Sequence, residues 1–259
     1  MIIIYSYEYA KLFKRSLIKL LGDTMAEDLS FLEGSAGAGL DSITANEQAI
    51  PYLGMVQPDG VAAADGATPG VWRNSATGEE YGNVVTVVPL AFKTIWNERE
   101  GTAPFNTVGR YEPHSIPVTV QQPKGGKGYP KMINPDTGNE VQELYVYAVM
   151  LPEHPEAGVL LFNPTVSSMR TCKSWNTQLK GQILPNGARA PIFAYSWDLA
   201  SDLVDNPQKK GAKMAKFVKV QKSVVISKDL FDTFVKPQLP AIQQTVLSIT
   251  SDSDESAAE

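Results

Sequence analysis

Residues 84–96 read VVTVVPLAFKTIW, and this stretch decides the fold class. It is dense in β-branched and other apolar residues, a composition typical of a strand that packs on a buried, pleated surface. Pro89 interrupts the run. Because proline cannot donate a hydrogen bond to a neighbouring strand, it predicts either an edge position or a bulge. The chain is therefore expected to be built around a β-sheet.

A second strand is predicted at residues 141–150, VQELYVYAVM. Apolar residues alternate strictly here, and successive side chains of a strand point to opposite faces of the sheet. Leu144, Val146 and Met150 fall on an aliphatic face that is expected to meet the core. Tyr145 and Tyr147 fall on the other face and are expected to point outward.

The remaining chain supplies short strands, loops and two helices. Apolar residues recur at three- and four-residue spacing between Val166 and Ile183, which predicts a helix. A closing helix is expected from Ser227, as its N-cap, to about Ile249. Further strands are expected at 116–120, 159–162, 191–199 and 215–226, with Val218, Val220, Val224 and Ile226 on one side of the last. Loops are expected at 30–80 and 123–135, and no internal repeat is recognised.

The order of these elements predicts a mainly β fold with α. Several strands, one helix, two strands and a terminal helix is the layout of an OB-fold-like five-stranded barrel with an inserted helix and a C-terminal helix. A generic α+β domain with the same order of elements is the alternative. We expect three parts: an N-terminal extension at 1–28, a domain at 29–249 and a disordered acidic tail at 250–259.

The sequence lacks the residues and motifs that are typical of several classes of catalytic site. The chain of 259 residues holds one cysteine and two histidines, too few for a disulfide framework or a usual Cys/His zinc site. No phosphate-binding loop or G-x-S-x-G motif occurs, and Lys124-Gly-Gly-Lys-Gly128 has the wrong spacing. We therefore expect no enzyme, no cofactor and no metal. The carboxylates that could in principle hold Mg²⁺ are Glu140, Glu143, Asp198, Asp202 and Asp205, the last three at a helical spacing that is more typical of a solvated face.

The two ends have distinctive charge patterns. Residues 1–21 could form a basic amphipathic helix for a membrane surface or partner, or could be sequence upstream of a start at Met25. No run reaches the ~20 apolar residues of a membrane span. The tail from Ser251 holds four acids, so without it the formal net charge of −5 becomes −1. The tail could occupy a basic groove, dock on replication proteins or act as a solubilising terminus.

Basic residues are segregated along the chain and interleaved with aromatic ones. Residues 166–197 contain four basic residues and no acid, and residues 206–222 contain six lysines and no acid. The candidate DNA-binding residues are Trp72, Arg73, Lys93, Trp96, Arg110, Tyr111, Lys124, Lys127, Tyr129, Lys131, Tyr145, Tyr147, Arg170, Lys173, Lys180, Lys213, Lys216 and Lys219.

This mixture is typical of proteins that bind single-stranded nucleic acid. Cations follow the phosphates, and flat rings stack on bases regardless of sequence, at about 1–3 kcal/mol per base. A duplex-reading protein would need a recognition helix or ribbon with base-reading side chains, and none stands out. The alternative is that the rings belong to the core and the lysines to a solvated face.

Three segments resemble a family of bacteriophage proteins. They are IPYLGMVQ at 50–57, PGVWRNSATG at 69–78 and NVVTVVP at 83–89. The resemblance, to bacteriophage single-stranded DNA-binding or replication accessory proteins, spans about 29–249. It implies an OB-type core, cooperative coating of single strands and a place in the host-cell cytoplasm. Acidic tails of single-strand binders commonly finish with an aromatic residue, whereas this one ends Ala257-Ala258-Glu259.

The sequence thus predicts sequence-tolerant binding and protection of single-stranded DNA during phage DNA replication or recombination. Single-stranded DNA is the expected partner, with replication proteins as a second class through the tail and no membrane. Self-association, and DNA against RNA preference, stay open. A virion structural or scaffold protein is the alternative, and a metal-dependent nuclease is the third hypothesis.

Overall fold

The computed structural model of the chain describes residues 51–101, 106–123, 130–207, 209–240 and 242. The chain divides into two compact units, Met1–Ala49 and Ile50–Glu259, and the described residues all belong to the second. The expected extension at 1–28 and the expected tail at 250–259 lie outside them.

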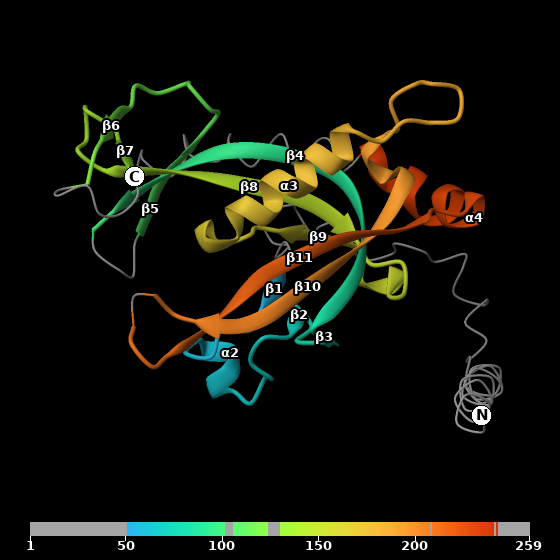
Figure 1. Cartoon of the computed structure of the whole chain (residues 1–259), viewed down its shortest axis with the longest axis horizontal. Coiled ribbons are helices and arrows are strands. Elements are labelled where there is room, and N and C mark those ends of the chain that lie inside the picture. The colour runs from blue at the N-terminus through green and yellow to red at the C-terminus, as the bar shows by residue number, and fades with distance from the viewer. Residues whose placement is uncertain (1–50, 102–105, 124–129, 208, 241, 243–259) are drawn as a thin grey trace, which may run out of the picture. The chain divides into compact units, whose positions relative to one another are not determined.

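An antiparallel sheet of eight strands forms the body of this unit and curls into a half-barrel (Figure 1). The strand order is β11-β10-β4-β8-β7-β6, while β5 pairs with β4 and β9 pairs with β8. The predicted mainly β class with helices is confirmed, with more strands than the expected five. The strands are β4 (Val84–Glu100), β5 (Asn106–Tyr111), β6 (Thr119–Gln121), β7 (Lys131–Ile133), β8 (Glu140–Met150), β9 (Val159–Phe162), β10 (Tyr195–Asp205) and β11 (Lys213–Val225).

A smaller sheet precedes β4, where the sequence led us to expect mostly loops. It consists of β1 (Leu53–Met55), β2 (Trp72–Asn74) and β3 (Glu80–Gly82), with the short helix α2 (Val61–Ala64) between its first two strands. The expectation is wrong because Leu53 and Trp72, although isolated among small residues, are completely buried. A few well-placed apolar side chains are enough to fix three short strands on the core.

The inserted helix is α3 (Met169–Lys180), preceded by the 3₁₀ turn η5 (Val166–Ser168). Two further turns, η4 (Pro155–Ala157) and η6 (Ile192–Ala194), flank β9 and β10. The closing helix begins at α4 (Lys228–Leu230) and continues through the π-helical turn η7 (Phe231–Val235). The predicted N-cap is confirmed, since Leu230 N donates to Ser227 Oγ at 3.1 Å.

None of the helices among the described residues is both long and apolar enough to cross a membrane.

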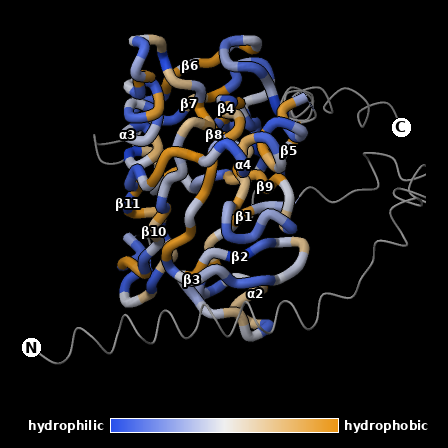
Figure 2. The backbone as a smooth tube through the Cα atoms, turned by 90° about the vertical axis from the view of Figure 1, so that its right-hand side faces the viewer, coloured by the Kyte–Doolittle hydropathy of each residue, from blue (hydrophilic) through white to orange (hydrophobic). Residues whose placement is uncertain are grey.

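Both faces of the sheet are covered, by a different helix on each side. On one face Tyr147 and Trp197 pack with Trp175 of α3, and on the other Val146 and Met150 belong to the cluster that includes Val235 of η7. Figure 2 shows hydrophobic segments along the strands between these layers. The expectation that one face of β8 is exposed is therefore wrong, because α3 buries the tyrosine face as completely as the closing helix buries the aliphatic face.

Pro89 marks a bulge in the middle of the sheet, not an edge. Strand β4 lies between β10 and β8, and its register to β8 shifts between Pro89 and Ala91. The extra residue reverses the side-chain alternation. As a result Val87 and Phe92 both face α3, although residues five positions apart lie on opposite faces of a regular strand.

Two hairpin turns of the chain have the same design, a repeat that the sequence analysis did not recognise. The sequences are NSATGE at 74–79 and NPDTGN at 134–139. In each, the glycine N–H donates to the first asparagine's carbonyl, at 2.9 Å for Gly78 and 2.8 Å for Gly138. The asparagine Oδ1 accepts from the N–H two residues later, and both glycines have a φ of 77°. The signal was present as N-x-x-T-G.

The second turn is anchored by the buried carboxylate of Glu98 on β4. Glu98 is 1% exposed and accepts hydrogen bonds from Thr137 Oγ1, Asn139 Nδ2 at 2.9 Å and Asn134 Nδ2 at 3.2 Å. Burial alone would raise the pKa of this carboxyl, but these donors, with the hydroxyl of Tyr111, outweigh burial and lower the pKa. The turn is thus attached to the sheet through one charged acceptor.

Gly138→Ala should destabilise the fold by about 1–2 kcal/mol, because a Cβ disfavours positive φ. No atom lies within 4 Å of the added Cβ, so the cost is conformational. Gly138→Asn should cost less, because asparagine tolerates this region. Gly54→Ala is the control, since Gly54 has equal space without positive φ. Urea unfolding measures all three, and equal stabilities of the alanine variants would contradict the assignment.

Glu98 should make stability depend on pH in the acid range. Its pKa is depressed in the folded state, so its contribution is complete above the unfolded value of about 4.3 and is lost as the pH falls through the folded pKa. Glu98→Gln should cost about 1.5–3 kcal/mol at pH 7, because hydrogen bonds to a charged acceptor are lost. Urea unfolding between pH 3 and 7 should show a smaller pH dependence in the variant, and an unchanged profile would contradict this role.

Candidate functional site

Four of the predicted base-stacking rings are buried: Tyr145 is 8% exposed, and three others are less exposed still. Trp72 and Tyr147 are fully buried and Trp96 is 3% exposed. The ring centroid of Tyr147 lies 4.6 Å from that of Trp175, and that of Trp96 lies 4.9 Å from the ring of His114. The prediction that these three rings stack on bases is wrong, because an incoming base cannot reach their faces without unfolding the core.

Several predicted DNA-binding cations have partners within the chain. Lys93 pairs with Glu112 at 2.7 Å, and its side chain is only 10% exposed. Among the others, Lys131 pairs with Glu140 at 2.6 Å, Lys213 pairs with Asp205 at 2.7 Å, and Arg73 Nε donates to the carbonyl of Gly78 at 3.1 Å. The carboxylates offset the charges of the three lysines, and the hydrogen bond to Gly78 fixes the position of Arg73. These lysines therefore contribute less positive potential than the sequence suggests.

The two candidates on β5 differ in exposure. Arg110 is exposed, whereas Tyr111 is half-buried and its hydroxyl contacts Glu98. Lys124, Lys127 and Tyr129 lie outside the described residues.

A bulge in β11 changes which of its side chains face the core. The register to β10 shifts between Ala200 and Ser201, so Phe217 and Val220, three positions apart, contact the same core. Val218 is 39% exposed and Val224 64% exposed. The predicted valine side of this strand is therefore wrong, because the bulge breaks the alternation on which it depended.

The same bulge separates Lys216 and Lys219 of β11 from the lysines of α3. Lys216 and Lys219 alternate with the core-facing residues on both sides of the bulge, so they project from the sheet face opposite to α3. Asp202 lies directly across from Lys216. The structure therefore does not bring these lysines into one channel with the helix cations.

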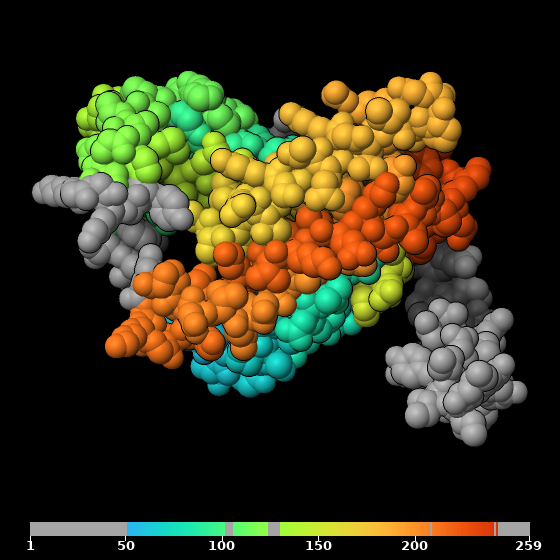
Figure 3. Space-filling model, viewed as in Figure 1, coloured from blue at the N-terminus to red at the C-terminus, as the bar shows by residue number. Residues whose placement is uncertain are grey.

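The cations of α3 form a stripe along the exposed side of the helix. Arg170, Lys173 and Lys180 are exposed, and none forms an ion pair with another described residue. Trp175 and Cys172 anchor the opposite side of the helix in the core. On the visible face of the molecule α3 and β11 lie side by side (Figure 3).

Two further cations join this stripe at the end of α3. The chain turns back after the helix, and a bridge between Ile183 and Arg189 holds the returning segment. Lys222 lies on the other flank, where its Nζ donates to Gln182 Oε1 at 3.0 Å and lies 4.4 Å from the ring centroid of Tyr195. The C-terminal end of α3 is thus the place where cations from three segments gather.

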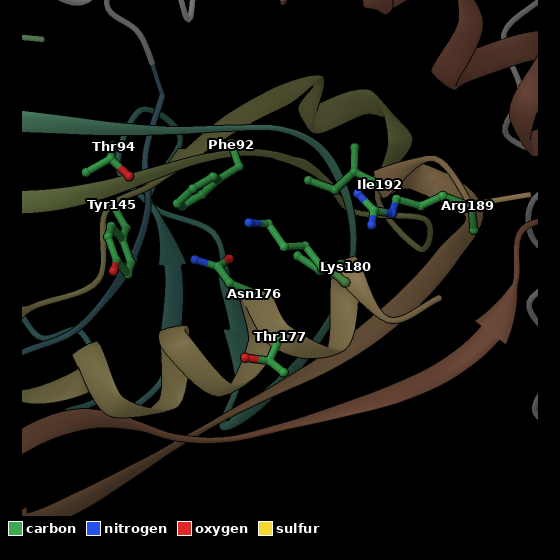
Figure 4. A pocket seen from close by; sticks show the side chains of 10 residues that line it. Phe92, Thr94, Tyr145, Asn176, Thr177, Lys180, Arg189 and Ile192 are labelled. Carbon is green, nitrogen blue, oxygen red and sulfur yellow. The ribbon is translucent and has the colours of Figure 1, made fainter. Parts of the chain in front are cut away.

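A cavity of about 530 Å³ opens beside this end of α3 (Figure 4). Phe92, which is 37% exposed, forms one wall together with Tyr145, and their ring centroids are 5.3 Å apart. No aspartate or glutamate among the described residues lines it. The lining residues are Phe92, Thr94, Tyr145, Asn176, Thr177, Leu179, Lys180, Arg189, Ala190 and Ile192.

The orientation of Asn176 follows from a buried hydroxyl behind it. Tyr147 donates its hydroxyl proton to Asn176 Oδ1 at 2.9 Å, which leaves the amide Nδ2 as the group free to serve the cavity. Burial, with the thiol of Cys172 and the ring of Tyr145 nearby, raises the pKa of Tyr147 far above its usual range, so the hydroxyl stays a donor. The amide is therefore positioned by the core.

Tyr145 is the one predicted ring that lines the cavity. It is 8% exposed, and burial followed by the carboxylate of Glu143 raises the pKa of its hydroxyl. Glu143 thus places negative charge beside the tyrosine, whereas Lys180 and Arg189 bring positive charge from α3 and the segment after it. The cavity is therefore more negative near Tyr145 and more positive near Lys180 and Arg189.

The carboxylates considered for Mg²⁺ are dispersed in the described part of the chain. Asp198, Asp202 and Asp205 lie on strand β10, not on a helix, and Asp198 accepts from Thr86 Oγ1 at 2.9 Å. Glu140 is bound by Arg99 and Lys131. Three potential metal ligands come together elsewhere, at Glu79, His154 and Glu156, all near the surface.

Sequence reasoning missed Phe92 and Asn176 as site residues and left Arg189 outside the candidate set. The signal for Phe92 was Pro89, because a bulge after an unbroken β run shifts which residues share a face. Arg189 could have been included as the last cation of the acid-free stretch 166–197. The polar side of α3 gives no equivalent signal for Asn176.

Cys172, the one cysteine of the chain, should be unreactive while the protein is folded. Its side chain is fully buried, and burial raises the pKa of the thiol to about 12. Ellman's reagent at pH 8 should give almost no reaction in buffer and one thiol per chain in 6 M guanidinium. Rapid reaction in buffer would show that α3 does not cover the sheet as described.

The comparisons with known proteins add a family. The family described as Pam3 phage gp34-like protein matches residues 22–248. No curated protein and no solved structure matches the chain. The match covers most of the chain, including every described residue. The chain belongs to the family of Pam3 phage gp34-like proteins, and so to a family of phage proteins.

Proposed function

We propose that this phage protein binds single-stranded DNA without strong sequence preference, in phage DNA replication or recombination. The contact surface is the cation stripe of α3 with the neighbouring cavity. The observation that carries the proposal is the position of Lys180 and Arg189, which line a cavity walled by the partly exposed ring of Phe92. Neither they nor Lys173, an exposed residue of the same helix, has an ion-pair partner among the described residues.

The physical requirements of single-strand binding favour this surface. Phosphates need cations that are not already neutralised, and unpaired bases need an accessible ring on which to stack. A base inside a duplex is stacked on both of its faces. A ring that lies inside a cavity, such as Phe92, can therefore stack only on a base that is not held in a duplex. The arrangement therefore favours an unpaired strand over double-stranded DNA.

The surface differs from the one that the sequence suggested. The lysines of β11 at 216 and 219 project from the other face, and Asp202 lies across from the first of them. Cations and aromatic rings instead come together where α3 packs on strands β4 and β8. The proposal accordingly assigns binding to the helix cations and not to the β11 lysines.

Removal of Lys173 and Lys180 should weaken binding of single-stranded DNA. In the double variant Lys173→Gln/Lys180→Gln, two phosphate contacts disappear. The slope of log K against log salt should therefore become shallower by about 1.4, at about 0.7 per phosphate on a single strand. Fluorescence anisotropy of labelled (dT)20 between 50 and 300 mM NaCl measures both affinity and slope.

The matched control is Lys216→Gln/Lys219→Gln, which removes the same charge from the opposite face. This control should retain most of the affinity and the slope of the unaltered protein. If the control variant loses as much as the helix variant, binding is not localised on α3. If (dT)20 does not bind the unaltered protein at 50 mM NaCl, the proposed function is wrong.

A further inference from the structure

We infer that the cavity beside α3 is a subsite for one nucleotide, with the base against Phe92 and Tyr145 and the phosphate between Lys180 and Arg189. This inference rests on the proposed function and names the chemistry of one contact within it. At this one position the strand is bound by stacking as well as by charge, whereas its other positions are bound by charge alone.

The cavity has the size and the wall that a base requires. Its volume of about 530 Å³ lies within the range of 300–1,000 Å³ that small-molecule sites occupy. The ring of Phe92 packs edge-on against Tyr145, with an interplanar angle of 74°. The ring of Phe92 also packs against Tyr147, with centroids 4.9 Å apart and an interplanar angle of 46°, and the residue is still 37% exposed. A planar aromatic ligand can cover the exposed part of the ring.

The amide and charged side chains of the cavity offer hydrogen-bond donors, and the hydroxyls of Thr94, Tyr145 and Thr177 can donate or accept. Asn176 has its Oδ1 engaged with Tyr147 and offers Nδ2, while Lys180 and Arg189 carry only donors. Within the part of the chain that the structure describes, no carboxylate lines the cavity. A ligand that matches this set carries acceptors, as the carbonyl groups of thymine and the oxygens of a phosphate do.

The distribution of charge gives the nucleotide an orientation. Figure 4 shows Tyr145 at one side of the cavity and Arg189 at the other, with Lys180 pointing inward between them. The carboxylate of Glu143 lies beside Tyr145 and would repel a phosphate there. The phosphate therefore lies at the Arg189 side, and the base lies toward β4 and β8.

The bulge at Pro89 and the stack of Trp175 on Tyr147 hold this subsite in place. The first puts Phe92 on the α3 face, and the second fixes the helix that carries Asn176 and Lys180. The walls belong to two long strands, a packed helix and the segment that returns after the helix, in which a bridge between Ile183 and Arg189 holds the backbone.

The first test is photochemical crosslinking with the unaltered full chain. A (dT)20 strand in which one thymine is replaced by 5-iodouracil is irradiated in complex with the protein, and crosslinked peptides are mapped by mass spectrometry. The inference expects crosslinks at Phe92 or Tyr145. Crosslinks confined to other residues overturn it, while binding of the strand itself upholds the proposed function.

The second test separates the ring from the charge. Phe92→Leu should weaken (dT)20 binding roughly 5- to 150-fold with an unchanged salt slope, since one stacking contact is lost. Arg189→Gln should make the slope shallower by about 0.7. Lys236→Gln, an exposed cation on the closing helix, is the control and should change neither quantity. Wild-type affinity in Phe92→Leu, with wild-type thermal stability, overturns the inference.

Titration with free nucleotides distinguishes a subsite for one nucleotide of a DNA strand from a subsite for a free nucleotide. Calorimetry with dTMP, thymidine and inorganic phosphate should show the tightest binding for dTMP, because it alone offers ring and phosphate together. Binding of dTMP without binding of (dT)20 would retain the subsite for a free nucleotide and overturn the proposed function. Binding of neither overturns both.

Discussion

The stack of Trp175 on Tyr147 is the contact on which the rest of the structure depends. With ring centroids 4.6 Å apart and both side chains fully buried, it attaches α3 to the centre of the curled sheet. Aromatic pairs of this kind contribute about 0.5–1.5 kcal/mol beyond their buried area. The same tyrosine also orients Asn176 through its hydroxyl, so the core contact and the polar lining of the cavity are coupled in one residue.

Once α3 is fixed in this way, the charges of the chain are divided between two faces. The helix cations stand next to the rings of β4 and β8, whereas the lysines at 216 and 219 face away and share their side with the acidic residues of β10. A charge count along the sequence cannot distinguish these sets, because it gives lysines on a strand and on a helix the same weight. The two bulges decide which of them share a surface.

The class of fold could be predicted from sequence, and so could the strong strands at 84–96 and 141–150, the inserted helix and the Ser227 cap. Their signals are local, in β-branched runs, in three- and four-residue spacing and in capping chemistry. The small sheet around Trp72 could not, because its strands are three residues long and are stabilised by burial against distant segments. For the site, the cations of α3 were predicted, but burial of Trp96 and Tyr147 depends on tertiary packing that periodicity does not encode.

Strand β4 also carries a consequence for how a change in its length would act. The bulge after Pro89 makes the side-chain alternation before it and after it independent of each other. An insertion of one residue between the bulge and Phe92 would reverse the facing of only the second half of the strand, and would turn the aromatic wall toward the closing helix. The position of Phe92 on the α3 face is therefore set by its distance from the bulge.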